Sequence, residues 1–250
     1  MPKVDILGVR VDVISKTEIE SAITEYARNR RNAVVAYANI HAINIAHRDV
    51  GFRDFLNQAA LLYCDGEGVR LGARILGSTL PPRVALTRWV WDLCALCEEH
   101  EFSIFLLGST GEVLDKAIAK LKERFPALLI AGSCHGYFQK VGPESDAVVE
   151  MINRSKPNLL FVGFGMPTQE HWISRNLERL DTNLILPAGA MIDYIAEVRG
   201  VAPSWISGIG WEWLYRLIQE PQRLWKRYLV GNPGFIFRVL VQRLKKGRQS

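Results

Sequence analysis

The sequence predicts an α/β fold in which helices cover both faces of a mainly parallel sheet, followed by a helical appendage at the C-terminus. Six short apolar runs without polar alternation are typical of strands buried on both faces. Helical stretches separate most of these runs, and this alternation is typical of a doubly wound, Rossmann-like sheet. The six runs are residues 33–38, 61–64, 103–107, 128–132, 159–165 and 183–189.

The expected helices follow from capping and periodicity. Thr17 and Glu20 have the spacing of a capping box, which predicts a first helix after Thr17. Residues 111–125 and 169–180 are predicted to form two further helices between strands. A chain of 250 residues is long enough for one large domain with an appendage. We expect the α/β core at residues 1–203 and the appendage at 204–250, where Pro221 and Pro233 separate about three short helices.

The composition is that of an ordinary globular protein, with 48% apolar and 23% charged residues. Cys94 and Cys97 form a CxxC without a second CxxC or a histidine pair, so we interpret them as a buried helical pair and not as zinc ligands. No signal peptide and no run of ~18 uncharged apolar residues is recognisable, which predicts a cytoplasmic protein.

The net charge of +5 is distributed unevenly along the chain. From Trp211 onward there are nine Lys or Arg and two Glu, a balance of +7, so the preceding residues sum to −2. Trp, Tyr and Phe are interleaved with these basic residues, a combination that favours an anionic membrane surface. A helical subdomain with a solvated basic face is the alternative. Binding of nucleic acid is a weaker interpretation, because the segment is rich in aliphatic residues.

Polar and glycine residues follow each of the six apolar runs. Ligands of doubly wound sheets bind beyond the carboxyl ends of the strands, so these residues are the candidate binding groups. They are Asn39, His41, Asp65, Gly66, Gly108, Ser109, Tyr137, Gly163, Gly165, Gln169, Glu170 and Asp193. The turn of residues 108–111 leads into a helix, a typical phosphate site. No GxGxxG follows the first strand and no Walker motif exists, which favours another phosphate-bearing ligand, such as a nucleotide-sugar.

Five blocks, in order, resemble the WecG/TagA/CpsF glycosyltransferases, glycosyltransferase family twenty-six. They are YANIHAINIAHRD, LLYCDGEGVRLGARILG, GFGMPTQEHW, PAGAMIDYIAEVRGVAPSW and GWEWLYRLIQEPQRLWKRY. The resemblance implies transfer of a sugar, with inversion, from a UDP-sugar to an undecaprenyl-diphosphate-linked saccharide in bacterial polysaccharide or exopolysaccharide synthesis. It also implies a peripheral enzyme on the inner face of the cytoplasmic membrane that needs no metal or other cofactor. A homo-oligomer is possible, and no nucleic-acid partner is expected.

The resemblance also assigns roles to residues. Asp65 of the DG motif matches the general base, and Arg83 and Arg216 match cations that stabilise the leaving group, in keeping with the lack of a DxD motif. Arg223 and Arg227 match further appendage arginines, and Asn39, Gln169 and Asp193 match positions that hold the donor. For His41, a structural hydrogen bond competes with donor contact.

Several alternatives remain open from the sequence. Asp65 is also placed to be a helix N-cap, Glu67 to be the base, and Arg83 to be an ordinary surface arginine. The arginines of the appendage are equally suited to contact phospholipids only. A protein of this fold that binds a nucleotide-sugar or lipid phosphate without catalysis is the main functional alternative, and a basic nucleic-acid-binding protein is the weaker one.

Two departures from the family pattern bear on the donor sugar. Many members read R-V-x-G-x-D where this chain has Leu86 and Arg88 in the glycine and acid positions. The family's RAP reads Val201-Ala-Pro203 here. N-acetylmannosamine, its uronate and glucose therefore all remain candidates for the transferred sugar.

Overall fold

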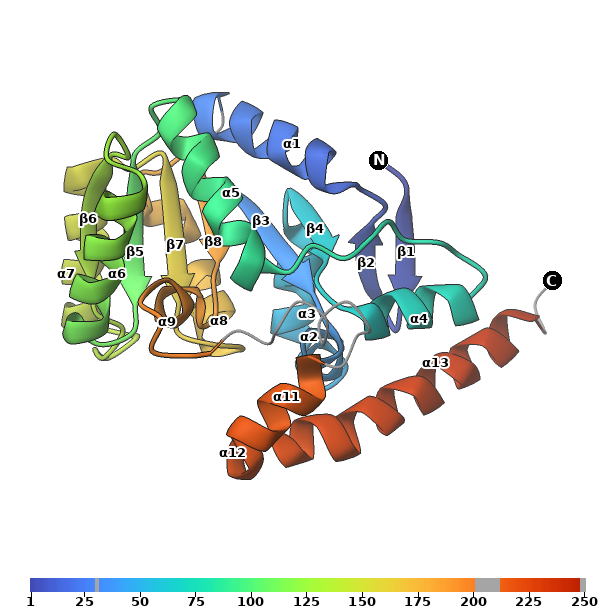
Figure 1. The fold of residues 1–250 in the computed structure, drawn as a ribbon. Coiled ribbons are helices and arrows are strands. Elements are labelled where there is room, and N and C mark those ends of the chain that lie inside the picture. The colour runs from blue at the N-terminus through green and yellow to red at the C-terminus, as the bar shows by residue number, and fades with distance from the viewer. Residues whose placement is uncertain (30–31, 201–211, 248–250) are drawn as a thin grey trace.

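The computed structural model describes residues 1–29, 32–200 and 212–247. Its centre is a six-stranded sheet in the order β4-β3-β8-β7-β5-β6, and every neighbouring pair is parallel (Figure 1). The predicted doubly wound α/β fold is confirmed. The strands are β3 (Ala33–Ala38), β4 (Leu61–Cys64), β5 (Ile104–Gly108), β6 (Ile130–Cys134), β7 (Leu159–Gly163) and β8 (Leu184–Pro187).

One strand begins later than its apolar run indicates. Residues 128–132 were expected to form it, but β6 starts at Ile130. Leu128 is buried and its N–H donates to the carbonyl of Phe125, so its apolar side chain belongs to a turn after the preceding helix. Because β6 is an edge strand paired with β5 alone, its register is decided by that single partner.

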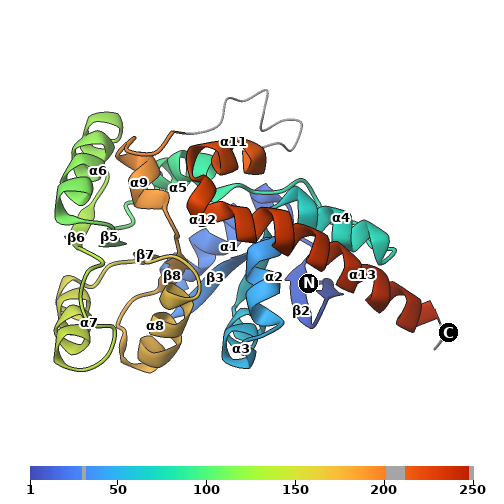
Figure 2. The ribbon, with the colours of Figure 1, turned by 90° about the horizontal axis from the view of Figure 1, so that it is seen from below.

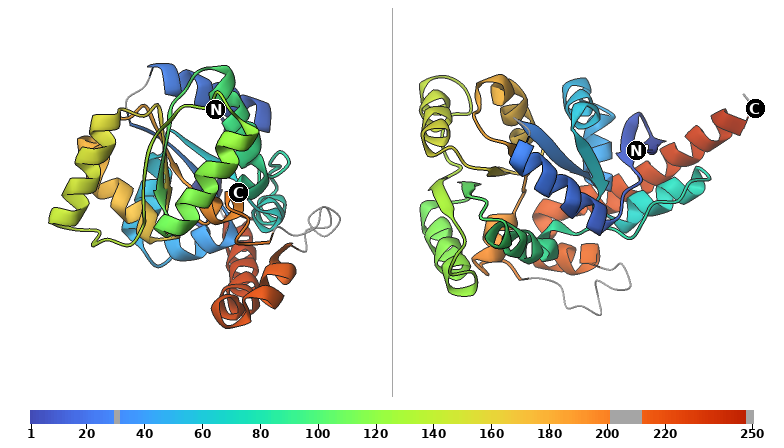
Figure 3. Two further views of the ribbon diagram at one scale, coloured as in Figure 1. Left: turned by 60° about the vertical axis from the view of Figure 1, so that its left-hand side comes forward. Right: turned by 90° about the horizontal axis from the view of Figure 1, so that it is seen from above.

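Helices cover both faces of the sheet (Figure 3). Tyr37 and Val35 point into one core and Val34 and Ala36 into the other, as alternation along a strand requires. The first face is covered by α1 (Lys16–Asn29), α5 (Leu86–Glu99), α6 (Gly111–Arg124) and α9 (Met191–Ile195). The second is covered by α2 (Ile40–Ala46), α3 (Val50–Gln58), α4 (Glu67–Ile75), α7 (Pro143–Ser155) and α8 (Thr168–Asn176), which the short 3-10 helix η1 (Leu177–Arg179) extends.

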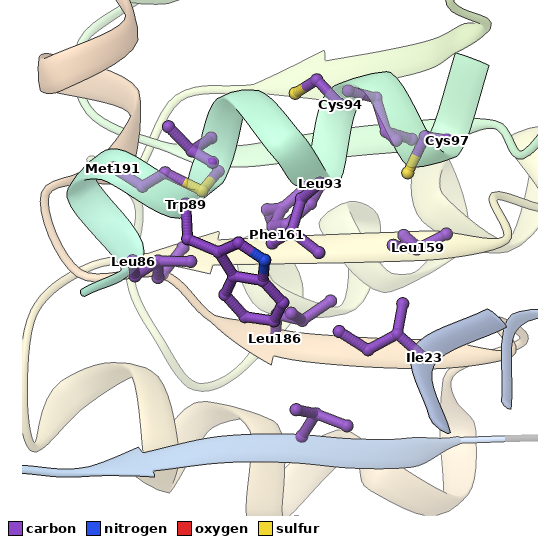
Figure 4. Packing of buried hydrophobic residues seen from close by; sticks show 14 of the residues in the cluster. Ile23, Leu86, Trp89, Leu93, Cys94, Cys97, Leu159, Phe161, Leu186 and Met191 are labelled. Atoms are coloured by element: carbon purple, nitrogen blue, oxygen red, sulfur yellow. The ribbon is translucent and has the colours of Figure 1, made fainter. Parts of the chain in front are cut away.

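The CxxC lies on the buried side of α5. Cys94 and Cys97 are almost fully buried and point into the first core beside Leu93, while Leu159 and Phe161 line the strand beneath (Figure 4). Burial raises the pKa of both thiols, that of Cys94 to about 12. The pair is therefore an apolar packing element, as the sequence predicted.

The N-terminal segment adds a hairpin to the predicted elements, and its helix α1 begins two residues earlier than predicted. It forms an antiparallel hairpin of β1 (Lys3–Ile6) and β2 (Val9–Asp12), whose turn residues Leu7 and Gly8 both have positive φ. The hairpin lies against edge strand β4, and buried Asp12 accepts from the backbone N–H of Leu62 at 2.8 Å. The capping box expected at Thr17 is wrong by two residues, because Ser15 and Glu18 make the reciprocal bonds that begin α1.

The C-terminal helices lie across one end of the sheet (Figures 1 and 2). They are α11 (Glu212–Gln219), α12 (Pro221–Trp225), the π-helical stretch η2 (Lys226–Val230) and α13 (Gly231–Gly247). Pro221 begins α12 as expected, but the expectation that Pro233 ends a helix is wrong. The wider π turn directly before α13 accommodates the proline ring, which would otherwise meet the carbonyl of Leu229.

The last helix is partly integrated into the core. Phe235 and Val239 are fully buried, and a Cβ on Gly72 of α4 would meet the Phe235 ring at 2.8 Å. Gln242 accepts from the N–H of Leu7 at 3.0 Å, which ties α13 to the hairpin turn. The predicted boundary at residues 203 and 204 and the departure at 201–203 lie outside the described residues. No helix in the described part of the chain is long and apolar enough to cross a membrane.

Candidate active site

The carboxyl ends of all six strands lie at one edge of the sheet, which Figure 2 views from below. Asn39 follows β3 and Asp65 follows the neighbouring strand β4, so the parallel pairing brings them together. Asn39 caps α2 by accepting from Ala42 N–H at 3.0 Å, and its amide donates to the Asp65 carboxylate at 3.5 Å. The N-cap of α4 is Gly66, so the interpretation of Asp65 as a helix cap is wrong.

Two arginines surround Glu67. Arg70 Nη1 donates to both Glu67 carboxylate oxygens, at 2.9 and 2.8 Å, and Arg83 Nε lies 3.8 Å from Glu67 Oε1. The backbone N–H of Val84 donates to the carbonyl of Cys64, which fixes the Arg83 loop beside the end of β4. Only 16% of the Arg83 side chain is exposed, so it is not an ordinary surface arginine. Both Glu67 oxygens are engaged in holding guanidinium groups at this strand end.

The hydroxyl of Tyr37, one residue before the end of β3, marks the middle of the site. Burial raises the pKa of Tyr37, with the Glu170 and Asp65 carboxylates adding to the effect; its hydrogen bond with Gln169 and the nearby Arg227 oppose it. The charges of Asp65, from one strand end, and of Arg227, from the C-terminal helices, therefore both influence this hydroxyl. The site combines a carboxylate of the core with a cation of the appendage.

Gln169 and Glu170 are buried side chains that connect the loops after β7 and β8. Gln169 is fully buried, and its Oε1 accepts from the N–H groups of Gly165 and Gly189 at 3.1 and 3.0 Å. Its Nε2 donates to Glu170 Oε1 at 2.8 Å, whereas Glu170 Oε2 is buried without a hydrogen-bond partner. Burial raises the pKa of Glu170 to about 7. These two side chains hold the loops after β7 and β8 together.

Glycines allow three strand ends to approach one another. A Cβ on Gly108 would lie 2.5 Å from the carbonyl oxygen of Gly163, and a Cβ on Gly163 would lie 2.8 Å from that of Gly189. Gly165, with φ of 82°, faces open space. The predicted glycines of β5 and β7 thus have a close-packing role, independent of any ligand.

A chain of polar contacts runs from the core to the appendage. Ser109 Oγ donates to Asp193 Oδ1 at 2.7 Å, and Asp193 Oδ2 pairs with Arg199 Nε at 3.0 Å. Arg199 Nη1 lies 3.5 Å from Glu220 Oε1, and Glu220 in turn pairs with Arg223. Asp193 and Arg223, both predicted to bind substrate, are therefore linked through Arg199 and Glu220.

Two further appendage arginines also reach the core. Arg216 of α11 lies over the ring of Tyr194 in α9, with 5.6 Å from Cζ to the ring centre. Arg227 is close enough to His41 to add to the effect of burial, which lowers the pKa of that histidine to about 4. His41 is consequently neutral near pH 7.

Tyr137 is far from Asp65 but lies next to the loop after β5, since the N–H of the preceding Gly136 donates to the carbonyl of Ser109 at 2.8 Å. It follows edge strand β6, five inter-strand spacings from β4, or about 24 Å. Its side chain is 75% exposed. Among the described residues there is also no cluster of three or more His, Cys, Asp or Glu suited to a metal ion.

The family is decided by a comparison over nearly the whole chain. The model of the glycosyl transferase WecG/TagA/CpsF family matches residues 4–249. The chain belongs to this family of glycosyltransferases. Similar curated proteins include those of Staphylococcus aureus strains MW2 and NCTC 8325 / PS 47, each 29% identical over 95% of this chain and 92% of the relative. Both are named N-acetylglucosaminyldiphosphoundecaprenol N-acetyl-beta-D-mannosaminyltransferase.

Sequence reasoning missed four residues of this site. Arg70 stands three residues after Glu67, and that helical spacing was a usable signal. Tyr37 lies inside an apolar strand, and no local pattern distinguishes it from a core tyrosine. Arg199 and Glu220 are twenty-one residues apart, so only the tertiary structure shows that they form a pair.

Proposed function

We propose that this glycosyltransferase moves a sugar from a UDP-sugar to an undecaprenyl-diphosphate-linked saccharide, with inversion and without a metal ion. The observation that carries the proposal is that Asp65, held by Asn39 at the end of β4, shares the sheet edge with Arg83 of the core and with Arg216 of the appendage, which lies over Tyr194. A transferase needs a proton acceptor beside cationic groups for a diphosphate, and this arrangement supplies both.

In the proposed reaction Asp65 accepts the proton of the acceptor hydroxyl. The acceptor oxygen forms a bond to the anomeric carbon from the face opposite UDP. The bond from that carbon to the UDP oxygen breaks, and its electron pair leaves with UDP. Asn39 holds the Asp65 carboxylate through its amide, and α2 fixes Asn39 because the same side chain caps that helix.

The negative charge on departing UDP requires cations. Arg83 is held beside the β4 end by Glu67, and Arg216 and Arg227 extend from the appendage toward α9 and α2. We assign charge stabilisation to Arg83 and Arg216, and diphosphate binding to Arg223 and Arg227. Donor contacts are assigned to the loops after β5, β7 and β8, with Ser109 and Asp193 as the polar groups.

The identity of the sugars follows from the relatives only in part. Their name specifies an N-acetylmannosaminyl group and an N-acetylglucosamine-diphosphate-undecaprenol acceptor. We propose the same class of acceptor in bacterial surface polysaccharide synthesis. For the donor, the departure at Leu86 and Arg88 keeps N-acetylmannosamine, its uronate and glucose as candidates.

Substitution of the base tests this function. Asp65→Asn is expected to lower transfer about a hundredfold or more, because the proton acceptor is lost, while UDP binding is retained. Release of UDP is measured with a panel of UDP-sugars and a lipid-diphosphate-N-acetylglucosamine acceptor in excess EDTA, and UDP binding by calorimetry.

Glu67→Gln is the matched variant for this experiment. It is expected to have a smaller effect, because Glu67 only holds Arg70 and Arg83. Normal turnover by Asp65→Asn with loss of turnover in Glu67→Gln would transfer the role of base to Glu67. Absence of UDP release with every donor, despite UDP binding, would favour the non-catalytic alternative.

A further inference from the structure

Arginines line the contact between α2 and the C-terminal helices. His41, Asn44 and Arg48, in α2 and the turn after it, are spaced three and four residues apart and so lie on one side. Arg227, Gly231 and Arg238 lie on one side of the facing helical run. We call these six residues the arginine seam. Figure 2 shows α2 beneath this helical run.

The seam is closely packed at its centre. Asn44 Nδ2 donates to the carbonyl of Gly231 at 2.9 Å, and a Cβ on Gly231 would lie 3.0 Å from that nitrogen. Arg238 donates from Nη2 to Asn44 Oδ1. One end of the guanidinium of Arg238 is therefore held in place, and its position does not depend on a ligand.

In the described part of the chain, the positive charge of the seam is not paired with acids. Within residues 1–29, 32–200 and 212–247, no carboxylate forms an ion pair with Arg48, Arg227 or Arg238. The neighbouring Asp49 is already engaged, with Phe52 N–H and with His171. Arg238 Nε is buried without a hydrogen-bond partner. Burial lowers the pKa of Arg238, and the charge of nearby Arg48 lowers it further.

Asn44, which binds Arg238, lies one helical turn before Arg48, and two guanidinium groups brought together in this way have the composition of a phosphate site. Apolar side chains are exposed on another face of the same helix, about 100° to 160° around its axis from Arg238. Phe237, adjacent to Arg238, is 68% exposed, and Leu240 and Leu244 are exposed at the following helical positions. A helix with a cationic edge beside an exposed apolar face is typical of helices that lie among lipid headgroups, so the phosphate of a phospholipid fits this arrangement better than a soluble phosphate does.

We propose that Arg48 and Arg238 form a binding site for the phosphate of an anionic phospholipid headgroup. The site is separate from the group that we assign to the substrate diphosphates, since Arg238 follows Arg227 by eleven residues, or about 16 Å of helix. Occupancy would fix α13 at a defined depth in the lipid headgroups and hold the open sheet edge toward the membrane. The inference rests on the proposed membrane contact of the appendage.

Arg48→Gln is the most informative variant, because Arg48 is exposed and makes no ion pair within the described residues. It is expected to bind phosphatidylcholine vesicles containing phosphatidylglycerol about fivefold more weakly than the wild type does, with no change on phosphatidylcholine alone. The same variant is expected to melt at a higher temperature in the absence of lipid, since a repulsive charge is removed. Arg48→Lys should restore most of the binding, and Arg238→Gln should weaken it at least as much as Arg48→Gln.

Arg154→Gln is the matched control, as it removes one exposed positive charge from α7, away from α13 (Figure 1). Equal binding by Arg48→Gln and Arg154→Gln would overturn the headgroup site while leaving the membrane contact intact. Failure of the wild type to bind anionic vesicles would overturn the proposed membrane contact itself. Full displacement from vesicles by inorganic phosphate at constant ionic strength would show a soluble-anion site and also overturn the lipid assignment.

Discussion

At the scale of single residues, Glu170 is the most unusual group of the sheet edge. It is 1% exposed, and one of its carboxylate oxygens has no hydrogen-bond partner. A buried carboxyl is tolerated when it carries a proton, and burial accordingly raises the pKa of Glu170 to about 7. Its other oxygen accepts from Gln169, which orients the amide that joins the loops after β7 and β8.

The stability of the protein should therefore depend on Glu170 in a defined pH range. The folded state binds the proton more tightly than the unfolded state, so stability falls as pH rises from about 4.5 to about 7. Glu170→Gln is expected to remove this dependence. In the wild type it lowers the free energy of unfolding by roughly 3 kcal/mol once the pH has risen above about 7. The measurement is the free energy of unfolding in urea at about pH 5 and about pH 8.

Glu178→Gln serves as the control, since Glu178 is exposed in η1, close along the chain. It should leave the pH dependence of the wild type unchanged. An identical pH dependence in Glu170→Gln and the wild type would show that the carboxyl is ionised in the folded protein.

At the scale of secondary-structure elements, Arg199 connects α9 with the appendage. Its guanidinium pairs with Asp193 on one side and with Glu220, between α11 and α12, on the other. Arg216 over Tyr194 is a second contact between α11 and α9. The orientation of α11 over α9 thus depends on a few polar contacts, and both side chains of the Arg199–Glu220 pair are about one-third exposed.

Breaking this link should reduce transfer more than stability. Arg199→Gln is expected to lower kcat about fivefold, because a partly exposed pair contributes on the order of 1 kcal/mol. Glu220→Gln should have a similar effect, and the double variant should be little worse than either single one, since both remove the same link. UDP release and thermal melting are measured for the wild type, the two single variants and the double variant, which together form a double-mutant cycle.

Lys116→Gln, which breaks an exposed pair within α6, is the control and should leave kcat unchanged. Losses that add fully in the double variant would mean that Arg199 and Glu220 act independently, and the proposed connection would be wrong.

At the scale of the whole molecule, helix α13 packs into the core on one side and exposes apolar side chains on another. Phe235 and Val239 of α13 complete the core, while Phe237, Leu240 and Leu244 form an exposed stripe at helical spacing. Deleting the appendage would remove a buried Phe, a loss of ~3–5 kcal/mol, and would unfold part of the core along with any membrane contact. Substitutions within the exposed stripe separate these two effects.

Phe237→Asn and Leu244→Asn are expected to weaken binding to anionic vesicles about tenfold each, because a large apolar side chain is no longer buried in lipid. The melting temperature should change little, as 68% and 69% of these residues are exposed in the fold. Co-sedimentation with vesicles measures the binding. Val141→Asn, which removes an equally exposed apolar residue far from α13 in sequence, should bind as the wild type does. Undiminished binding by both stripe variants would refute lipid contact through this face.

The sequence by itself determined the architecture and the edge of the sheet that carries the polar groups. Apolar runs without alternation specify strands buried on both faces, and parallel strands necessarily present their carboxyl ends together. These two properties are enough to assign Asn39, Asp65 and the residues after β5, β7 and β8 to one edge of the sheet. Local patterns sufficed because these properties depend on neighbours along the chain.

Only the tertiary structure decided which of those groups meet. The strand order separates Tyr137 from Asp65 by the width of the sheet, although both follow strands. The structure also shows that Glu67 holds arginines, that Glu170 is buried, and that Arg238 binds Asn44 from nearly two hundred residues away. Ion pairing, burial and charge repulsion depend on distances through space, and a one-dimensional pattern does not contain those distances.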